Sequence, residues 1–294
     1  MHIGSCLWEG KPVLAVFDGD AAWIPARAGL TQLSDIWAVL DGGDAALAAL
    51  RAWRTEAAPS SRVPLAGLKL CAPIPRLRKD VICLGWNYAD HLRESAAVQG
   101  KAMDIPEHPI IFTKRLTAVS GPYDDIPDDP HVTSQLDWEV ELGVVIGKAG
   151  RHIPQERALE HVLGYSVIND VSARDVQFRH KQYFLGKSID NTSPMGPWIV
   201  TADEIADPQN LGLECRVNGV VKQRSNTRHQ IFRIDYVIAT LSRHLTLEPG
   251  DVIATGTPDG VGFARTPPEY LRAGDVVECE IEGIGVIRNR VSSA

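Results

Sequence analysis

Short apolar runs separated by Gly and Pro dominate the chain after its first quarter. They lie at residues 81–84, 142–146, 198–200, 213–217, 251–255 and 276–281. Helical patterns are few, at about residues 89–98, 155–162, 171–178 and 231–243. Many strands without strand–helix alternation argue against a doubly wound parallel sheet. We therefore expect an α+β fold that is mainly β, a mixed β-sandwich or β-roll with peripheral helices.

The beginning of the chain has a different pattern and predicts a small α+β domain. Residues 12–24 hold two apolar runs around an Asp-Gly pair, which predicts a hairpin. Residues 31–54 carry apolar side chains at helical spacing, interrupted by two glycines. The proline-spaced segment 71–77 is typical of a linker. The expected division is a small N-terminal domain at 1–73 and a catalytic domain at 74–294.

The composition is that of an ordinary globular protein and excludes several partners. Of 294 residues, 44% are hydrophobic and 23% are charged, and the formal net charge of -7 argues against nucleic acid. Five scattered cysteines without a C-x-x-C spacing argue against a disulfide framework or a thiolate zinc site. No stretch approaches the ~18 apolar residues needed to span a bilayer, and the start lacks a signal-peptide pattern. We expect a cytoplasmic protein with no membrane partner.

Two glutamates stand two positions apart where an apolar run begins. In a strand, Glu139 and Glu141 share one face, with Cα atoms roughly 6.6 Å apart. An isolated Glu-x-Glu is more often a solvated strand face, because Glu is mostly exposed. The apolar run that follows indicates a strand that enters the core, where two like charges need a cation.

A second polar group follows an apolar strand that ends at Asn169. Asp170, Arg174 and Gln177 stand at i, i+4 and i+7, which we expect to form one face of a helix. In one interpretation Asp170 is a helix N-cap that forms an ion pair with Arg174. In the other, the carboxylate of Asp170 binds a metal, and the guanidinium of Arg174 and the amide of Gln177 bind an organic anion beside it. Three carboxylates without His or Cys favour a hard cation, Mg²⁺ first, with Mn²⁺ or Ca²⁺ as alternatives and zinc disfavoured.

Three further segments carry candidate chemistry. His91 and Glu94 stand at i, i+3 on a short helix, so the carboxylate could orient the imidazole as a general base, although a surface pair is the commoner outcome. The polar stretch 95–108 could form a lid. Lys187 follows a Gly in an apolar setting and could equally be a surface Lys. The Gly-rich turn 254–262 could cradle a carboxylate with its N–H groups, but it lacks the features of a nucleotide-binding loop.

Together these blocks resemble the fumarylacetoacetate hydrolase family, in particular its longer bacterial-type members with an N-terminal extension. The matching blocks are 87–94, 139–142, 164–177, 186–188 and 251–262, within a resemblance over about 80–292. The resemblance implies a β-roll, a small keto acid as partner and a homodimer. It also implies a metal at Glu139, Glu141 and Asp170, a His91–Glu94 pair that activates water, Lys187 near the substrate, and contacts with the acid from Arg174, Gln177 and Thr257. No role is carried to Lys114, because the Pro that often follows it in relatives is absent.

On this resemblance we expect a Mg²⁺-dependent hydrolase that cleaves a C–C bond in a 2,4-diketo acid or acylpyruvate-type substrate. His91 would take a proton from the attacking water, and Lys187 would stabilise the oxyanion or assist protonation of the enolate. The alternative is a decarboxylase or keto–enol isomerase of an oxaloacetate-like 2-keto dicarboxylic acid. A non-catalytic metal- and ligand-binding protein is disfavoured, because both the metal ligands and the acid–base pair are present.

Overall fold

The computed structural model describes residues 1–100 and 104–294, and within them most strands belong to one large mixed sheet. Its eleven strands run in the order β4-β3-β2-β1-β13-β11-β10-β16-β5-β6, with β7 paired to β13. Their bounds are β1 (His2–Trp8), β2 (Lys11–Asp18), β3 (Ala21–Trp23), β4 (Arg62–Pro64), β5 (Val81–Gly85), β6 (Ile110–Lys114), β7 (Val119–Ser120), β10 (Val140–Ile146), β11 (Val162–Asn169), β13 (Ser193–Thr201) and β16 (Val252–Ala254).

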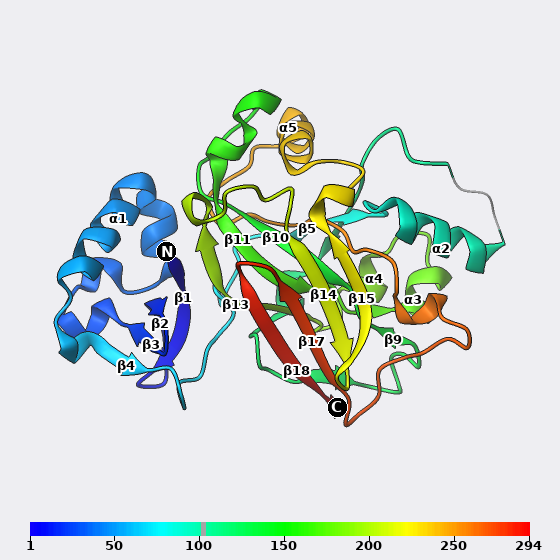
Figure 1. Cartoon of the computed structure of the whole chain (residues 1–294), viewed down its shortest axis with the longest axis horizontal. Helices are drawn as coiled ribbons and strands as arrows, with labels where there is room; N and C mark the ends of the chain where they lie inside the picture. The colour runs from blue at the N-terminus through cyan, green and yellow to red at the C-terminus, as the bar shows by residue number, and fades with distance from the viewer. Residues whose placement is uncertain (101–103) are drawn as a thin grey trace.

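A second sheet of five strands packs against the centre of the first (Figure 1). It has the order β15-β14-β17-β18-β8, with bounds β8 (Ile126–Asp128), β14 (Gly212–Val217), β15 (Val220–Asn226), β17 (Val276–Ile281) and β18 (Gly285–Ser293). The strands β9 (Leu136–Asp137) and β12 (Ser172–Ala173) pair separately. Alternate residues of β17, such as Val277 and Ile281, join Leu142 and Val144 of β10 in one buried cluster. The main core therefore lies between the two sheets.

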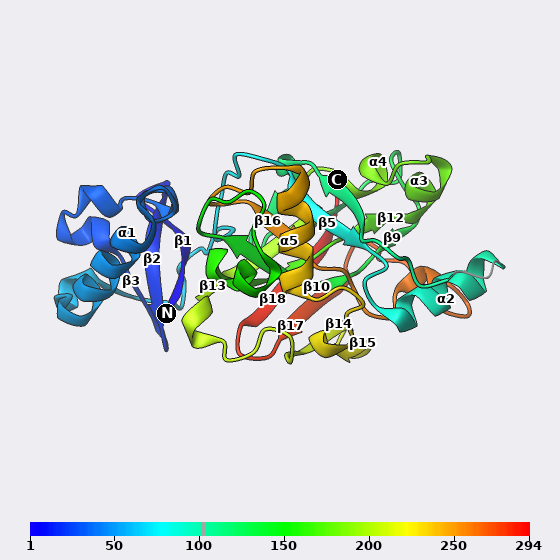
Figure 2. The same cartoon turned by 90° about the horizontal axis from the view of Figure 1, so that it is seen from above.

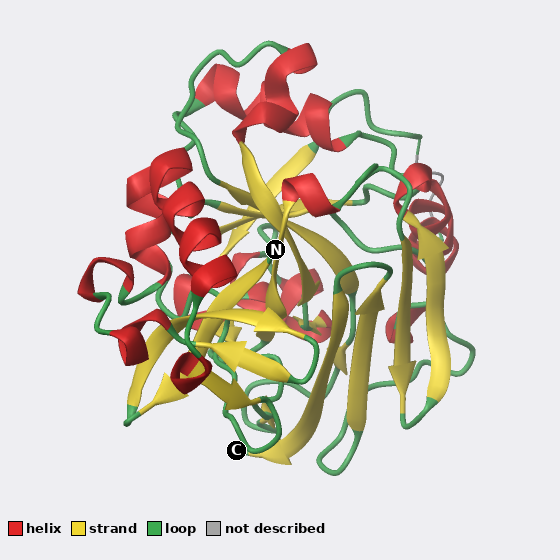
Figure 3. Cartoon of the chain, turned by 60° about the vertical axis from the view of Figure 1, so that its left-hand side comes forward, coloured by secondary structure: helices red, strands yellow, loops and turns green. Residues whose placement is uncertain are grey.

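Helices lie around the rim of the strands (Figure 3). The α-helices are α1 (Ile36–Glu56), α2 (Ala89–Gln99), α3 (Arg174–Arg179), α4 (Phe184–Lys187) and α5 (Ile234–His244). Short 3₁₀ helices lie at Pro25–Ala28, Thr31–Leu33, Pro59–Ser61, Leu116–Ala118, Gln155–His161, Ala202–Glu204, Thr227–His229 and Gly262–Ala264. Figure 2 shows α5 across the top of the strands, where Val237, Ile238 and Leu241 enter the main core. No helix within the described residues is long and apolar enough to cross a membrane.

The N-terminal unit, blue in Figure 1, continues the large sheet. Strand β1 pairs antiparallel with β13, with Ile3 opposite Ile199, and α1 contributes Leu40 to the same buried cluster as Ile199. The predicted hairpin is present as β2 and β3. The predicted interruption of the helix is also present, at Gly43 with φ 56°. The boundary at residue 73 stays a prediction.

The mainly β, α+β class is confirmed, and two local predictions need correction. The helix expected from residue 171 begins at Arg174, because Ser172 and Ala173 pair with Asp137 and Leu136 instead. Of the predicted lid at 95–108, the first residues continue α2, and residues 101–103 lie outside the described part of the chain.

Candidate functional site

Three carboxylates meet where β10 and β11 lie side by side. Glu139 directly precedes β10, Glu141 lies within it, and Asp170 follows the end of β11, which is paired with β10. All three side chains are buried, and one oxygen of each lies within 4.8 Å of the others. The solvated-face interpretation is therefore wrong for both glutamates. Asp170 reaches the cluster from a strand end and not from the expected helical face.

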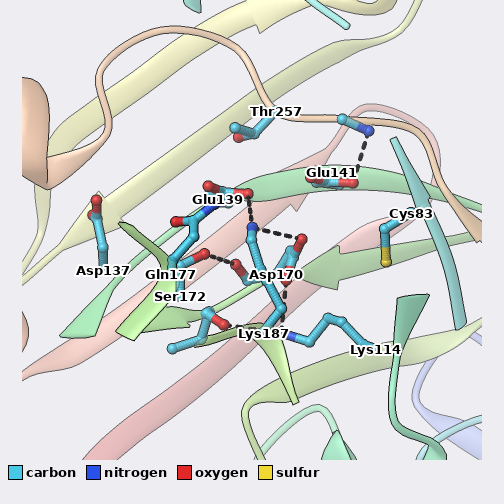
Figure 4. Close-up of polar contacts among 12 residues, drawn as sticks. Cys83, Lys114, Asp137, Glu139, Glu141, Asp170, Ser172, Gln177, Lys187 and Thr257 are labelled. Carbon is cyan, nitrogen blue, oxygen red and sulfur yellow. Dashed lines mark hydrogen bonds and ion pairs between the residues drawn. The ribbon is translucent and has the colours of Figure 1, made fainter. Parts of the chain in front are cut away.

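Two lysine ammonium groups bind the carboxylates of this cluster (Figure 4). The Nζ atom of Lys187 lies 2.7 Å from Oε2 of Glu139 and 2.8 Å from Oδ2 of Asp170. The Nζ atom of Lys114 donates to Oδ1 of Asp170 at 2.6 Å. Both lysines are buried, so the surface interpretation of Lys187 is wrong. Gly186 permits this packing of α4, because a Cβ there would lie 2.6 Å from the backbone N of Gln177.

Arg174 lies on α3, with its guanidinium beside the cluster. Its Nε donates to Asp137 at 2.8 Å, and its Nη1 lies 2.7 Å from Oε1 of Glu139 and 3.0 Å from Oε1 of Gln177. Burial alone would lower the pKa of Arg174, but the two neighbouring carboxylates raise it above its usual value. The buried Nη2 has no hydrogen-bond partner among the described residues. This donor suits an anionic ligand.

The charges of the cluster do not balance. Burial would raise the pKa of Glu139, but the cations of Lys187 and Arg174 hold it at about 2. Burial, together with the carboxylates of Asp170 and Glu139, raises the pKa of Glu141 well above its usual value. The buried groups are four carboxylates (Asp137, Glu139, Glu141, Asp170) and three cations (Lys114, Arg174, Lys187).

This donor set fits a divalent cation. The Glu141 carboxylate has no side-chain cation as a hydrogen-bond partner among the described residues, and it accepts only the backbone N–H of Gly256, at 2.7 Å. An all-oxygen set of carboxylates is the ligand type that hard cations prefer. A cation shared by Glu139, Glu141 and Asp170 would relieve the repulsion that burial imposes on Glu141.

The Gly-rich turn at 254–262 does cradle carboxylates, but they belong to the protein. Its backbone N–H groups donate to Glu141 from Gly256, to Glu94 from Gly260 at 2.9 Å, and to Asp137 from Gly262 at 2.7 Å. Gly256 has φ 92°, and a Cβ there would lie 2.7 Å from the Cβ of Asn87, so glycine is required. The turn positions the site and leaves ligand binding to side chains.

Helix α2 supplies the imidazole of the site. Nδ1 of His91 lies 2.8 Å from Oε1 of Glu94, so the predicted pair forms. One pocket is lined by His91, Arg174, Gln177, Lys187 and Thr257 together. The predicted catalytic and substrate-binding positions therefore lie together, with Glu94 behind His91.

Thr257 lines the pocket with its hydroxyl already engaged. Its Oγ1 donates to the carbonyl of Val140 at 2.9 Å and accepts a hydrogen bond from Nε2 of Gln223 at 2.8 Å. Its predicted contact with the substrate stays a prediction. Gln177, by contrast, uses its carbonyl oxygen for Arg174, which leaves its amide N–H₂ group for a ligand.

Sequence reasoning missed two residues that hold the site together. Lys114 received no role, yet it is fully buried at the end of β6 and bonds Asp170 and the carbonyls of Val171 and Thr192. Asp137 is fully buried, and its Oδ2 accepts a hydrogen bond from Nε–H of Arg174. The available signal was a lysine that ends an apolar strand, because a charge in such a place needs a buried partner.

Comparisons with known proteins identify the family. The family described as fumarylacetoacetate (FAA) hydrolase C-terminal matches residues 80–292, and the chain belongs to this family. "Oxaloacetate tautomerase YisK" of Bacillus subtilis is 50% identical over 77% of this chain and 74% of its own. "Oxaloacetate tautomerase Fahd2a, mitochondrial" of Rattus norvegicus is 47% identical over 86% of this chain and 78% of its own.

Solved structures agree with the fold. The "Fumarylacetoacetate hydrolase (EaFAH)" of Exiguobacterium antarcticum has a TM-score of 0.82 and 37% identity, with both chains fully covered. A "5-carboxymethyl-2-hydroxymuconate delta-isomerase" of Mycobacterium smegmatis has a TM-score of 0.76 and 32% identity, covering 100% of this chain and 99% of its own. The homodimer implied by the resemblance stays a prediction.

These relatives correct the expected reaction. The C–C hydrolase expected from the sequence is wrong, because the similar curated proteins are named oxaloacetate tautomerases. The alternative, chemistry on an oxaloacetate-like acid, agrees better with them. The physical reason for the error is that a carboxylate cluster beside a His–Glu pair can promote either water attack or enolisation, so residue types alone do not separate the two reactions.

Proposed function

We propose that the protein is a divalent-metal-dependent keto–enol tautomerase of oxaloacetate or a closely similar 2-keto dicarboxylic acid. The observation that carries the proposal is the buried triad of Glu139, Glu141 and Asp170 in contact with a pocket that also holds His91 and Lys187. Its relatives' names support the choice of this reaction among those that such a site permits.

The triad would hold Mg²⁺, with Mn²⁺ or Ca²⁺ as alternatives, because its three donors are carboxylate oxygens. When bound, the ion would act as a Lewis acid that polarises the keto group of the substrate. Gly256 and Lys114 keep Glu141 and Asp170 in place by direct hydrogen bonds. The ligands are thus oriented before substrate arrives.

His91 would move the proton at C3 of the substrate. Glu94 is bonded to Nδ1 and favours the tautomer with the proton on that nitrogen, which leaves Nε2 as the basic atom. Nε2 would take the C3 proton when the enol forms and return it when the ketone forms, while the C2 oxygen takes up its proton from water in the first case and releases it to water in the second. Gly260 fixes the second oxygen of Glu94, so the carboxylate keeps the imidazole oriented.

Lys187 and Arg174 would stabilise the negative charge of the substrate. The pKa of Lys187 is raised, because the carboxylates of Asp170 and Glu139 outweigh the effect of burial, so its ammonium stays charged and stabilises charge on the C2 oxygen. The free Nη2 of Arg174 would donate a hydrogen bond to the C1 carboxylate, and the Gln177 amide would donate beside it. Neither donor takes part in the ion pairs of the cluster, which use Nε and Nη1 of Arg174.

The test follows the loss of enol absorbance after enol-oxaloacetate is added to the purified protein with Mg²⁺. We expect a metal-dependent acceleration that excess chelator abolishes and Mg²⁺ restores, while NMR shows oxaloacetate and not pyruvate as the product. Full acceleration in excess chelator would show that the reaction does not need a metal ion. Pyruvate as the main product would indicate the decarboxylase alternative, and cleavage of acylpyruvates would restore the hydrolase.

A further inference from the structure

Helix α2 presents a second polar group to the pocket besides the imidazole. Ser95 follows His91 by four residues, so both lie on one face of the helix, and both line the pocket. Ser95 is 1% exposed. Its Oγ has no hydrogen-bond partner among the described residues. A helical serine can bond the carbonyl four positions back, but Ser95 does not make this bond.

Two of the other polar groups of the pocket already have identified partners. Lys187 bonds two carboxylates, and Thr257 uses its hydroxyl as both donor and acceptor. Buried polar groups without a partner are rare, because their desolvation is not compensated. Two such donors line this pocket, Nη2 of Arg174 and Oγ of Ser95, and they come from different elements, α3 and α2.

A 2-keto dicarboxylate has two anionic ends. One end would bind Nη2 of Arg174 beside the Gln177 amide, which leaves the buried Oγ of Ser95 for the other. Arg174 adjoins the carboxylate cluster directly, through Glu139, so it suits the keto-acid end. Ser95 lies on α2, and the pocket that it lines also has the apolar side chains of Phe112 and Phe178 in its lining. In such surroundings a carboxylate gains most from a donor, because a hydrogen bond to a charged group is strong and water competes little.

We propose that Ser95 donates a hydrogen bond to the distal C4 carboxylate of the substrate and thereby selects dicarboxylic over monocarboxylic 2-keto acids. The proposal rests on the proposed function, because it assumes a 2-keto dicarboxylate in this pocket. Ser95 is a specificity residue, which binds the part of the substrate that does not react. A site that pairs a polar group of its substrate discriminates against an analogue without that group, since the buried donor then stays unpaired.

The experiment compares oxaloacetate with its 4-methyl ester, which keeps the keto-acid end and loses the distal charge. For Ser95→Ala we expect KM for oxaloacetate to rise about tenfold with kcat within about twofold, and both constants for the ester to stay within about twofold. Ser95→Cys, which keeps the volume but donates weakly, should show the same loss. Ser95→Thr, which keeps the hydroxyl, should retain the preference for oxaloacetate.

Ser61→Ala is the matched control. Ser61 is also buried with an unpartnered Oγ, but it lies in the N-terminal unit and does not line the pocket, so its kinetics should match the wild type. An equal change for both compounds in Ser95→Ala, or no change for either, would overturn the proposal.

Calorimetric titration separates this inference from the proposed reaction. The Mg²⁺-loaded wild type and Ser95→Ala are titrated with oxaloacetate and with the ester, a measurement that does not depend on turnover. A wild type that prefers oxaloacetate in binding, and loses this preference in the variant, supports Ser95 even where no tautomerisation is seen. A wild type that binds both compounds equally refutes the role of Ser95 whatever the reaction.

Discussion

Two parts of the pocket are built in different ways. The floor consists of Glu139, Glu141 and Asp170 at β10 and β11, and the wall consists of helix α2 with His91 and Ser95. The floor is made of antiparallel strands in the core, and Glu141 and Asp170 are held there by a backbone amide and a buried lysine. The wall is a single eleven-residue helix at the rim, attached through buried Leu92 and through the contact of Glu94 with Gly260. On the proposed function, metal and anion binding would depend on the core, whereas proton transfer and selectivity would depend on a peripheral helix.

The largest effect should come from Glu141→Gln on the floor. The substitution keeps the volume and an oxygen for the amide of Gly256 but removes the charge that the ion needs. We expect kcat/KM to fall by about 10³-fold or more, since Lewis-acid stabilisation contributes several kcal/mol. We expect Mg²⁺ affinity, measured by calorimetry, to be lost as well.

The same variant should be no less stable than the wild type when both are metal-free. Glu141 is repelled by Glu139 and Asp170 in a buried place, so an uncharged amide relieves repulsion. Thermal unfolding in excess chelator measures this, with Glu160→Gln, an exposed change far from the floor, as control. A destabilised metal-free variant would contradict the account of the floor.

His91→Asn on the wall should separate turnover from binding. We expect kcat to fall by about 10²- to 10⁴-fold, the usual contribution of a general base, with Mg²⁺ affinity unchanged because His91 is not among the ligands. His161→Asn, which alters a half-buried histidine that does not line this pocket, should leave both quantities unchanged. Loss of Mg²⁺ in His91→Asn would mean that wall and floor do not act separately.

The sequence predicted the parts of the site that depend on local spacing. Glu139 and Glu141 share a strand face, and His91 and Glu94 share a helical turn, so the period of each element places both pairs. The mainly β class was equally visible in the short apolar runs.

Features that depend on non-local pairing were not predictable in this way. Asp170 was assigned to a helical face, but the pairing of Ser172 with Asp137 replaces that helix start by a strand. The role of Lys114 depends on Asp170, 56 positions away, so the apolar strand that it ends can indicate a buried partner but cannot say which residue that partner is. The prediction of the reaction was wrong for a chemical reason, because hydrolysis and enolisation need the same residue types.

Glu94→Ala should give the smallest of these effects and test how the wall works. Glu94 does not line the pocket, and it orients His91 through Nδ1 while Gly260 holds its other oxygen. We expect kcat to fall about 10- to 100-fold, as for other carboxylates that orient a histidine, with KM and Mg²⁺ affinity little changed. Asp90→Ala, on the same helix, removes an ion pair with the exposed Arg93 and should leave kcat unchanged. A loss in Glu94→Ala as large as in His91→Asn would mean that the carboxylate itself takes part in proton transfer, and the wall would then hold two reacting groups instead of one.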